Sequence, residues 1–355
     1  MQPDHLARLQ ELGWDDRYAA SLSALGDPAL SPARVGADYG AALLVHGAFG
    51  SRRAALGRRL RRAPDPVAVG DWVALRAAPD SHEIAALLDR RSAIRRKTPD
   101  VETTGQVLAA NVDVVFIATA LNGDFNPRRI ERLLTVVHQS GAEPVLLLTK
   151  SDLGGAEAAT ARAHDSAPGV PVISLSSVTG EGFEAVSRVL GRGRTGVVVG
   201  SSGVGKSTLI NVLTGSAGLR TGEVHRSGQG RHVTTRRELF LLPGGGVVID
   251  TPGLREIQVW SGEEALEKAF DDVEEIVRRC RFSNCRHEGD AGCAAAAALA
   301  AGTLDPGRWA SYRKLERELR AVEVRASARL QIEERRRWKG VQREARRRAE
   351  AKRRF

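Results

Sequence analysis

A glycine-rich segment in the middle of the chain has the residue types that a phosphate-binding loop needs. Residues 200–207 read GSSGVGKS and match G-x-x-x-x-G-K-[ST], between a predicted strand, TGVVVG, and a predicted helix, STLINVLTG. Glycines let backbone N–H groups surround a phosphate, the lysine neutralises its β and γ oxygens, and the next hydroxyl binds Mg²⁺. The expected nucleotide-binding residues here are Gly200, Ser201, Ser202, Gly203, Val204, Gly205, Lys206, Ser207 and Thr208.

A second motif, DTPG, follows the apolar run GVVI and has the residues of a γ-phosphate sensor. Asp250 can hold the magnesium shell through water, and the Gly253 N–H can meet the γ-phosphate. Between this motif and the phosphate loop, the polar sequence GRHVTT is typical of a mobile switch loop. We expect its Thr234 and Thr235 to contact the nucleotide, with Ser207 and Thr235 as magnesium ligands.

Two motifs that precede the phosphate loop have the residues that recognise guanine. The first, TKSD after the run PVLLL, consists of Thr149, Lys150, Ser151 and Asp152. It resembles N-K-x-D, whose carboxylate accepts hydrogen bonds from N1–H and the 2-amino group of guanine. Adenine has neither donor, so such a site rejects it. The second, SSVTG after PVISL, begins with Ser176 and Ser177 and resembles the loop that contacts the guanine oxygen.

The order of these motifs differs from that of a Ras-like GTPase, in which base recognition comes after the phosphate loop. The same strands can still form one sheet, because the position of the chain termini does not decide which strands are neighbours. The permuted order instead changes the segment that is covalently attached to the sensor, since the chain after DTPG runs directly into the C-terminal region. Nucleotide state could therefore move that region.

A cysteine and histidine cluster lies in the C-terminal region. All three cysteines of the chain and one histidine fall within fourteen residues, at Cys280, Cys285, His287 and Cys293. Three thiolates and an imidazole with no open position suit a closed, structural zinc site with one Zn²⁺ per chain. The alternative is reduced cysteines packed as small hydrophobic residues.

The elements that position these motifs follow from the apolar pattern. From Val112 onward, fully apolar runs alternate with helical stretches, which predicts a parallel α/β sheet covered on both faces. Short apolar segments between Ala37 and Leu75 predict a small OB-like β-barrel. After Trp260 the pattern is helical. The expected parts are an N-terminal extension (1–36), the barrel (37–97), a circularly permuted P-loop GTPase domain (98–259), and a helical zinc-binding module with basic C-terminal helices (260–355).

The net charge of +10 is concentrated at the two ends of the chain. Residues 306–355 contain 18 Lys/Arg against 7 Asp/Glu, and residues 34–97 contain 13 against 6. This asymmetry predicts a polyanionic partner bound mainly through its phosphates, since aromatic residues are only 5%. The alternative is that the tail is a solvated helix. No apolar run approaches the roughly 18 residues of a membrane span, so we expect a cytoplasmic protein without a signal peptide. We also expect a monomer.

The permuted motif order, the basic N-terminal barrel and the cysteine module resemble the RsgA family, the ribosome small-subunit-dependent GTPases, over about residues 37–310. The resemblance implies a permuted GTPase that binds the immature small ribosomal subunit and its rRNA, hydrolyses GTP to GDP and phosphate, and then leaves. It also implies that His232, in the switch loop, is catalytic. Leu254 stands where Ras-like enzymes have the glutamine that positions water, so intrinsic turnover should be slow. The alternative for His232 is a loop histidine with no part in catalysis.

One residue departs from the base-recognition pattern. Thr149 stands where N-K-x-D has asparagine, which contacts the base and braces the phosphate loop. Threonine keeps a hydroxyl but has less reach, so we expect weaker nucleotide affinity, with guanine preference retained through Asp152.

Two other functions stay open at this point. One is an RNA-binding assembly scaffold whose nucleotide site hardly hydrolyses GTP, and the other is a permuted GTPase of large-subunit assembly.

Overall fold

The computed structural model describes residues 3–63, 65–77, 82–96, 106–215, 237–251, 263–288 and 290–326. The chain forms two compact units. The first contains Met1–Lys97 and Gly105–Gln258, and the second contains Thr98–Thr104 and Val259–Phe355. None of the described helices combines the length and apolar character needed to cross a membrane.

Five described strands of the first unit close into a barrel, in the order β1-β2-β3-β5-β4 with β4 paired back to β1. The strands are β1 (Leu30–Asp38), β2 (Leu43–Gly47), β3 (Gly50–Leu56), β4 (Trp72–Ala77) and β5 (His82–Leu87), with a short 3₁₀ helix η1 (Leu60–Arg62) after β3. Inward-facing apolar residues such as Val35, Val45, Val73 and Ile84 fill the barrel. The predicted OB-like barrel is confirmed, and its first strand already begins at Leu30.

Helices α1 (Pro3–Glu11) and α2 (Asp16–Ser23) precede the barrel and pack on it through aromatic rings. Trp14 meets Trp72 of β4 edge-on, with ring centroids 4.8 Å apart, and Tyr18 lies 5.6 Å from the same ring. Asp15 caps α2 by accepting a hydrogen bond from the Tyr18 N–H. The N-terminal extension is therefore part of the hydrophobic core of the first unit.

Arg34 of β1 is buried and joins three segments that are distant in sequence. Its guanidinium donates to the carbonyls of Leu12, Gly70 (3.1 Å) and Asn111 (3.0 Å). Its pKa is lowered to about 10 by burial, so the side chain stays charged at neutral pH. A buried charge is tolerated only when its hydrogen-bonding capacity is satisfied. Arg34 thus ties the N-terminal extension, the barrel and the segment that enters the α/β sheet.

The α/β sheet of the first unit has the strand order β10-β9-β8-β11-β13-β12. Its strands are β8 (Val114–Ala120), β9 (Glu143–Thr149), β10 (Val172–Leu175), β11 (Thr195–Gly200), β12 (Glu238–Leu241) and β13 (Val247–Asp250). All pairings within it are parallel except that of β12 with β13. β12 also pairs with β1 at Ala37 and Glu238, which makes barrel and sheet continuous. A separate hairpin of β6 (Ala93–Arg96) and β7 (Gln106–Ala110) lies between them in sequence.

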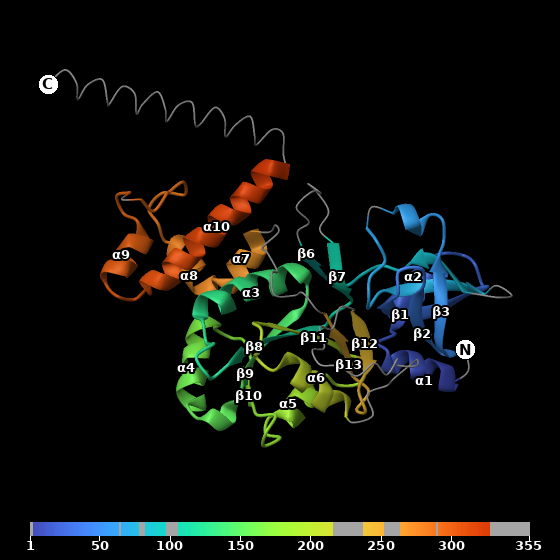
Figure 1. The fold of residues 1–355 in the computed structure, drawn as a ribbon. Coiled ribbons are helices and arrows are strands. Elements are labelled where there is room, and N and C mark those ends of the chain that lie inside the picture. Colours follow the sequence, from blue (N-terminus) through green and yellow to red (C-terminus); the bar gives the residue numbers. More distant parts are fainter. Residues whose placement is uncertain are drawn as a thin grey trace. The chain divides into compact units, whose positions relative to one another are not determined.

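Helices cover both faces of this sheet, as the uninterrupted apolar strands predict. They are α3 (Pro127–Ser140), α4 (Ala156–Ser166), α5 (Phe183–Val189) and α6 (Lys206–Thr214), with a 3₁₀ turn η2 (Ser151–Leu153) after β9. Phe116 and Val198 point towards α5 and α6 and form one core cluster with Phe183 and Leu209. Because side chains alternate along a strand, the intervening residues face α3 and α4. Figure 1 shows the two helix pairs on opposite faces of the sheet.

The described part of the second unit is helical and contains α7 (Glu263–Ala269), α8 (Asp271–Val277), α9 (Ala294–Ala300) and α10 (Pro306–Ala326). An aromatic group holds α10 to the other helices: Tyr312 contacts Phe270 edge-on and stacks on Trp309. Arg308 forms a bidentate ion pair with Asp272 and covers the Phe270 ring. The predicted helical C-terminal region is confirmed.

Candidate nucleotide site and metal centre

The phosphate loop connects β11 to α6, as its sequence predicts. Gly200 ends the strand at a point where a Cβ atom would lie 2.3 Å from the Ala118 carbonyl oxygen, so only glycine fits. Gly205 precedes the helix with a φ of 101°, a positive value that favours glycine because residues with a Cβ atom rarely adopt it. Ser207 and Thr208 are exposed in the first turn of α6. Their N–H groups and hydroxyls therefore lie at the positively polarised end of a helix, where phosphate binds favourably.

The lysine of the loop and the sensor aspartate lie close together. The Lys206 ammonium donates to the carbonyls of Gly200 (2.9 Å) and Ser201 (2.5 Å), which holds it against the loop. Asp250 ends β13, the strand next to β11. Burial raises the pKa of the Asp250 carboxyl above its usual range, while the Lys206 charge acts in the opposite direction. Lys206, Ser207 and Asp250 form the donor set that Mg²⁺ and a triphosphate require.

Thr149 connects the base-recognition motif to the phosphate loop. Its hydroxyl donates to the Val204 carbonyl at 2.7 Å, and the side chain is only 4% exposed. β9 ends at Thr149, in register with Ala120 of β8, and β8 is in turn in register with β11 at Gly200. The carboxyl ends of these parallel strands therefore meet at one edge of the sheet. Threonine reaches the loop with its hydroxyl, so the brace that asparagine makes in the N-K-x-D pattern is present in another form.

Asp152 is held in place by the second predicted motif. The Ser176 hydroxyl donates to the Asp152 carboxylate at 2.5 Å and accepts from the N–H groups of Val178 and Thr179. Lys150 has a φ of 62°, in the left-handed region, and turns the chain into η2. Asp152 and Ser177 are exposed at this edge of the sheet, with Ser176 buried behind them. A fixed carboxylate with a free side suits recognition of two adjacent N–H donors on a planar base.

The structure thus brings together the predicted residues of the phosphate loop, Asp250, and the two base-recognition motifs. Gly253, His232, Thr234, Thr235 and Leu254 lie outside the described residues. The sequence did not point to Asp124, whose carboxylate accepts a hydrogen bond from the Ser201 hydroxyl at 2.7 Å. The signal was weak, because Asp124 belongs to no motif. Its only mark is its position four residues after the buried strand β8 of the same sheet.

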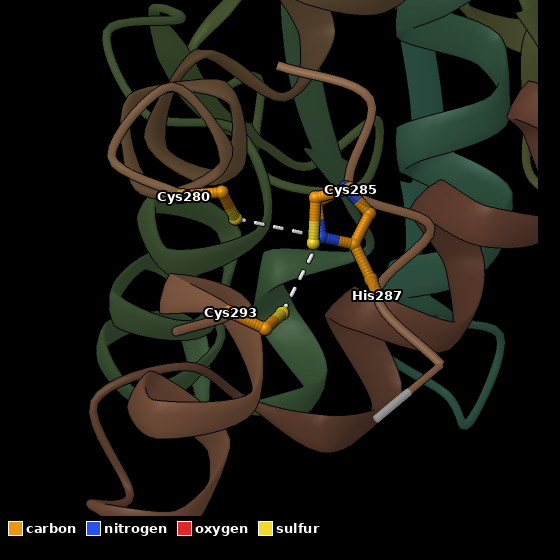
Figure 2. Close-up of side chains that lie close together, drawn as sticks. All are labelled: Cys280, Cys285, His287 and Cys293. Carbon is orange, nitrogen blue, oxygen red and sulfur yellow. Dashed lines mark hydrogen bonds between the residues drawn. The ribbon is translucent and has the colours of Figure 1, made fainter. Parts of the chain in front are cut away.

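The four predicted metal ligands come together in the second unit. The ligand atoms of Cys280, Cys285, His287 and Cys293 all lie within 4.8 Å of one another. In Figure 2 the imidazole and the three sulfurs point towards a common centre. The His287 Nδ1 atom lies 3.6 Å from the Cys280 sulfur and 3.4 Å from the Cys293 sulfur, so this nitrogen faces the cluster. Three soft sulfurs and one nitrogen fit a closed tetrahedral zinc site.

Helix α10 supports the histidine of this cluster. His287 has a φ of 59°, a left-handed conformation that is uncommon for a residue other than glycine. The Trp309 ring of α10 meets the imidazole edge-on at 5.4 Å, and Arg313 donates to the Arg286 carbonyl at 3.3 Å. These contacts fix the ring orientation from outside the cluster, which is a usual role for residues around metal ligands.

Comparisons with known proteins agree with this geometry. Residues 87–260 match the family described as RsgA GTPase. The chain is 45% identical over 354 residues to the small ribosomal subunit biogenesis GTPase RsgA of Opitutus terrae, covering 94% of this chain and 95% of that protein. The chain belongs to the RsgA GTPase family.

Other relatives support the same family and the fold. The RsgA of Syntrophotalea carbinolica is 40% identical over 353 residues, covering 96% of this chain and 97% of that protein. The crystal structure of YjeQ from Thermotoga maritima superposes with a TM-score of 0.61 at 25% identity, covering 82% of this chain and 98% of that one. YloQ, a circularly permuted GTPase, has a TM-score of 0.58, and the match covers 82% of this chain and 96% of that one. At 22% identity this likeness shows the fold alone.

Membership of the RsgA family confirms three predictions made from the residues. The chain is a circularly permuted GTPase, it hydrolyses GTP, and it uses a nucleotide with Mg²⁺. The cysteine and histidine cluster of this RsgA-family chain could hold zinc. Because the motif order is permuted, Thr149 of the base-recognition motif comes before Val204 of the phosphate loop in the sequence. The two residues still meet in a hydrogen bond.

Replacing Thr149 by valine tests the brace between base and phosphate recognition. Valine keeps the shape of threonine but leaves the Val204 carbonyl without this donor, at a cost of about 1–1.5 kcal/mol. We expect the Kd for a fluorescent GTP analogue to rise about tenfold, with the preference for GTP over ATP unchanged because Asp152 is untouched.

Thr149→Ser is the matched control, because it keeps the hydroxyl and should bind GTP nearly as the parent protein does. Equal GTP affinity in Thr149→Val and the parent protein would refute the brace. Equal affinity of the parent protein for GTP and ATP would refute base recognition by Asp152.

Proposed function

We propose that this protein is a GTPase that binds the small ribosomal subunit late in its assembly and acts as a maturation checkpoint. The subunit stimulates hydrolysis of GTP to GDP and phosphate, and hydrolysis releases the protein. The hydrogen bond between Thr149 and Val204 carries the nucleotide part of this proposal, since it unites base and phosphate recognition. The names of the relatives, small ribosomal subunit biogenesis GTPases, support the small subunit as the partner.

The nucleotide is proposed to lie along the edge of the sheet between Asp152 and Lys206. Asp152 accepts from the base, with Lys150, Ser151, Ser176 and Ser177 beside it, and the phosphate loop surrounds the phosphates. Ser207 and Thr235 are the residues that would hold Mg²⁺, with Asp250 acting through water, and the ion would supply positive charge to offset that of the phosphates. Gly253 and Thr234 complete the contacts to the γ-phosphate.

Hydrolysis requires a group that orients the attacking water, and Leu254 cannot supply one. We assign this part to His232, as the family resemblance implies, because an imidazole can accept or hold a proton near neutral pH. The residue is proposed to act only when the subunit is bound, so turnover by the protein alone is slow and fast turnover depends on the subunit.

Exposed arginines on the barrel are proposed to bind rRNA phosphates. Arg52 and Arg53 lie on β3 with exposed side chains, each over an aromatic ring, and the following loop adds four more exposed arginines. These are Arg58, Arg59, Arg61 and Arg62. The basic tail after Pro306 adds a second positive region. Binding through phosphates weakens steeply with salt, which is the expected behaviour of this interaction.

The remaining features of the proposal concern organisation. We propose an N-terminal extension before β1, a barrel from Leu30 to residue 97, a GTPase domain to residue 259, and a zinc module with basic helices beyond it. One structural Zn²⁺ is held by the four ligands of the second unit, supported by their donor chemistry and mutual distances. We further propose that the protein acts in the cytoplasm as a monomer.

A GTPase assay with and without purified small subunits tests the proposed function. We expect slow turnover alone and stimulation of at least about tenfold by small subunits, because the group that orients water is proposed to act only when the partner is bound. His232→Ala should bind GTP normally and lose the stimulation.

The outcomes of this assay separate the alternatives. Stimulation by large subunits only would contradict the partner and favour large-subunit assembly. Tight subunit binding without stimulated turnover would favour the assembly scaffold. Unchanged stimulation in His232→Ala would refute the role of that residue while leaving the function intact.

Removal of the metal tests the zinc site. A short, loop-rich segment depends on its metal for folding, so we expect one zinc per purified chain and loss of ordered structure in the second unit on chelation. Metal analysis measures the zinc content, and the change in near-ultraviolet circular dichroism, to which Trp309 contributes, measures the loss of structure. Cys285→Ser should lower zinc content, whereas Cys285→Asp, which keeps an anionic ligand, should retain part of it. A metal-free chain with an unchanged spectrum would contradict the site.

A further inference from the structure

We infer that Asp124 is a positioning residue for the phosphate loop: its carboxylate holds Ser201, and through it Lys206, in the arrangement that receives the nucleotide phosphates. The inference rests on the proposed nucleotide site but not on the ribosomal partner. Asp124 lies in the loop between β8 and α3, outside every motif described above.

Both oxygens of the Asp124 carboxylate are engaged, in different directions. Oδ2 accepts from the Ser201 hydroxyl at 2.7 Å and from the Ala120 N–H at 3.4 Å. Oδ1 forms an ion pair with the Arg129 guanidinium at 2.7 Å. One side of the carboxylate therefore faces the phosphate loop, and the other faces the first turns of α3.

The loop that carries Asp124 is held at several points. Asn126 caps α3 by accepting from the N–H groups of Arg128 and Arg129, and Pro127 occupies the first turn. The Thr119 hydroxyl donates to the Asp124 carbonyl, and Arg129 donates to it as well. Because main chain and side chain of Asp124 are both bound, its carboxylate has a defined position relative to the phosphate loop.

Ser201 connects Asp124 to Lys206 through two hydrogen bonds. Its hydroxyl is bound to Asp124, while its carbonyl accepts from the Lys206 ammonium at 2.5 Å. A residue fixed at its side chain presents its carbonyl in one orientation, so Asp124 sets the position of the ammonium that neutralises phosphate charge. Catalytic and binding groups depend on such supporting contacts for their geometry.

The negative charge of Asp124 requires a counter-charge at this position. A carboxylate close to a phosphate site repels the ligand, and the Arg129 guanidinium at 2.7 Å offsets that repulsion. Asparagine at position 124 should therefore serve in part, since its carbonyl oxygen can still accept from Ser201 while its NH2 group can no longer accept from Arg129. Loss of Arg129 should weaken binding, since it leaves the carboxylate charge without its partner.

A double-mutant cycle on nucleotide binding tests this inference. Asp124→Ala and Ser201→Ala should each raise the dissociation rate of fluorescent GDP and GTP analogues about tenfold, because each removes the same hydrogen bond. For the same reason the double variant should be no worse than the poorer single variant. Asp124→Asn, which keeps the acceptor for Ser201, should raise the rate less than Asp124→Ala does, and Arg129→Met should also raise it.

Further readouts separate positioning from a general structural role. In turnover measured over a range of GTP concentrations, Asp124→Ala should raise KM far more than it changes kcat, because the reacting groups themselves are intact. Asp165→Ala, which removes an exposed carboxylate from α4, is the charge-matched control and should leave the nucleotide dissociation rate unchanged. Should Asp124→Ala fail to fold, Ser201→Ala and Asp124→Asn still decide the matter.

The inference is overturned if the effects of Asp124→Ala and Ser201→Ala multiply, or if Ser201→Ala binds nucleotide as the parent protein does. It is also overturned if Asp124→Asn is as defective as the alanine variant. All of these measurements use the full chain without ribosomal subunits. A failure of subunit stimulation would therefore contradict the proposed function and leave this result unaffected.

Discussion

The hydrogen bond from the Thr149 hydroxyl to the Val204 carbonyl is the contact on which the nucleotide site depends. The permuted chain reaches base recognition first and phosphate binding later, so the two halves of the site have no covalent reason to lie together. The parallel strands β9, β8 and β11 bring their carboxyl ends to one edge of the sheet. The buried threonine then joins the two loops at that edge, and the Asp124 carboxylate accepts a further hydrogen bond from the phosphate loop at Ser201.

The first unit is held as one body by a second buried interaction. Arg34 donates to three carbonyls, one each from the N-terminal extension, the barrel and the entry to the α/β sheet. β12 pairs with both β13 and β1, so the strand that precedes the sensor strand also contacts the barrel. The barrel and the strand that carries Asp250 are thereby mechanically connected, which suits a protein in which nucleotide state and RNA binding are proposed to influence each other.

Much of this architecture could be predicted from the sequence, because buried parallel strands have continuous apolar runs and the phosphate loop has a specific pattern. The start of the barrel could not. β1 contains Pro32, Arg34 and Gly36, residues that disfavour a strand assignment, and Arg34 is buried only because distant carbonyls satisfy it. Helix α2 was also missed, since its stability comes from aromatic packing of Tyr18 on Trp72. Asp124 was missed because its role depends on a contact across 77 residues of sequence.

The most direct test of the account is a change of base specificity at Asp152. Replacing aspartate by asparagine exchanges one acceptor for a donor, which no longer matches the 2-amino group of guanine but does match the 2-oxo group of xanthine. Asp152→Asn should therefore bind GTP at least about tenfold more weakly than the parent protein and bind XTP more tightly than GTP. If Asp152→Asn binds GTP as the parent protein does and gains no affinity for XTP, Asp152 does not read the base. That result would contradict the proposal that base and phosphates share one site at the edge of the sheet.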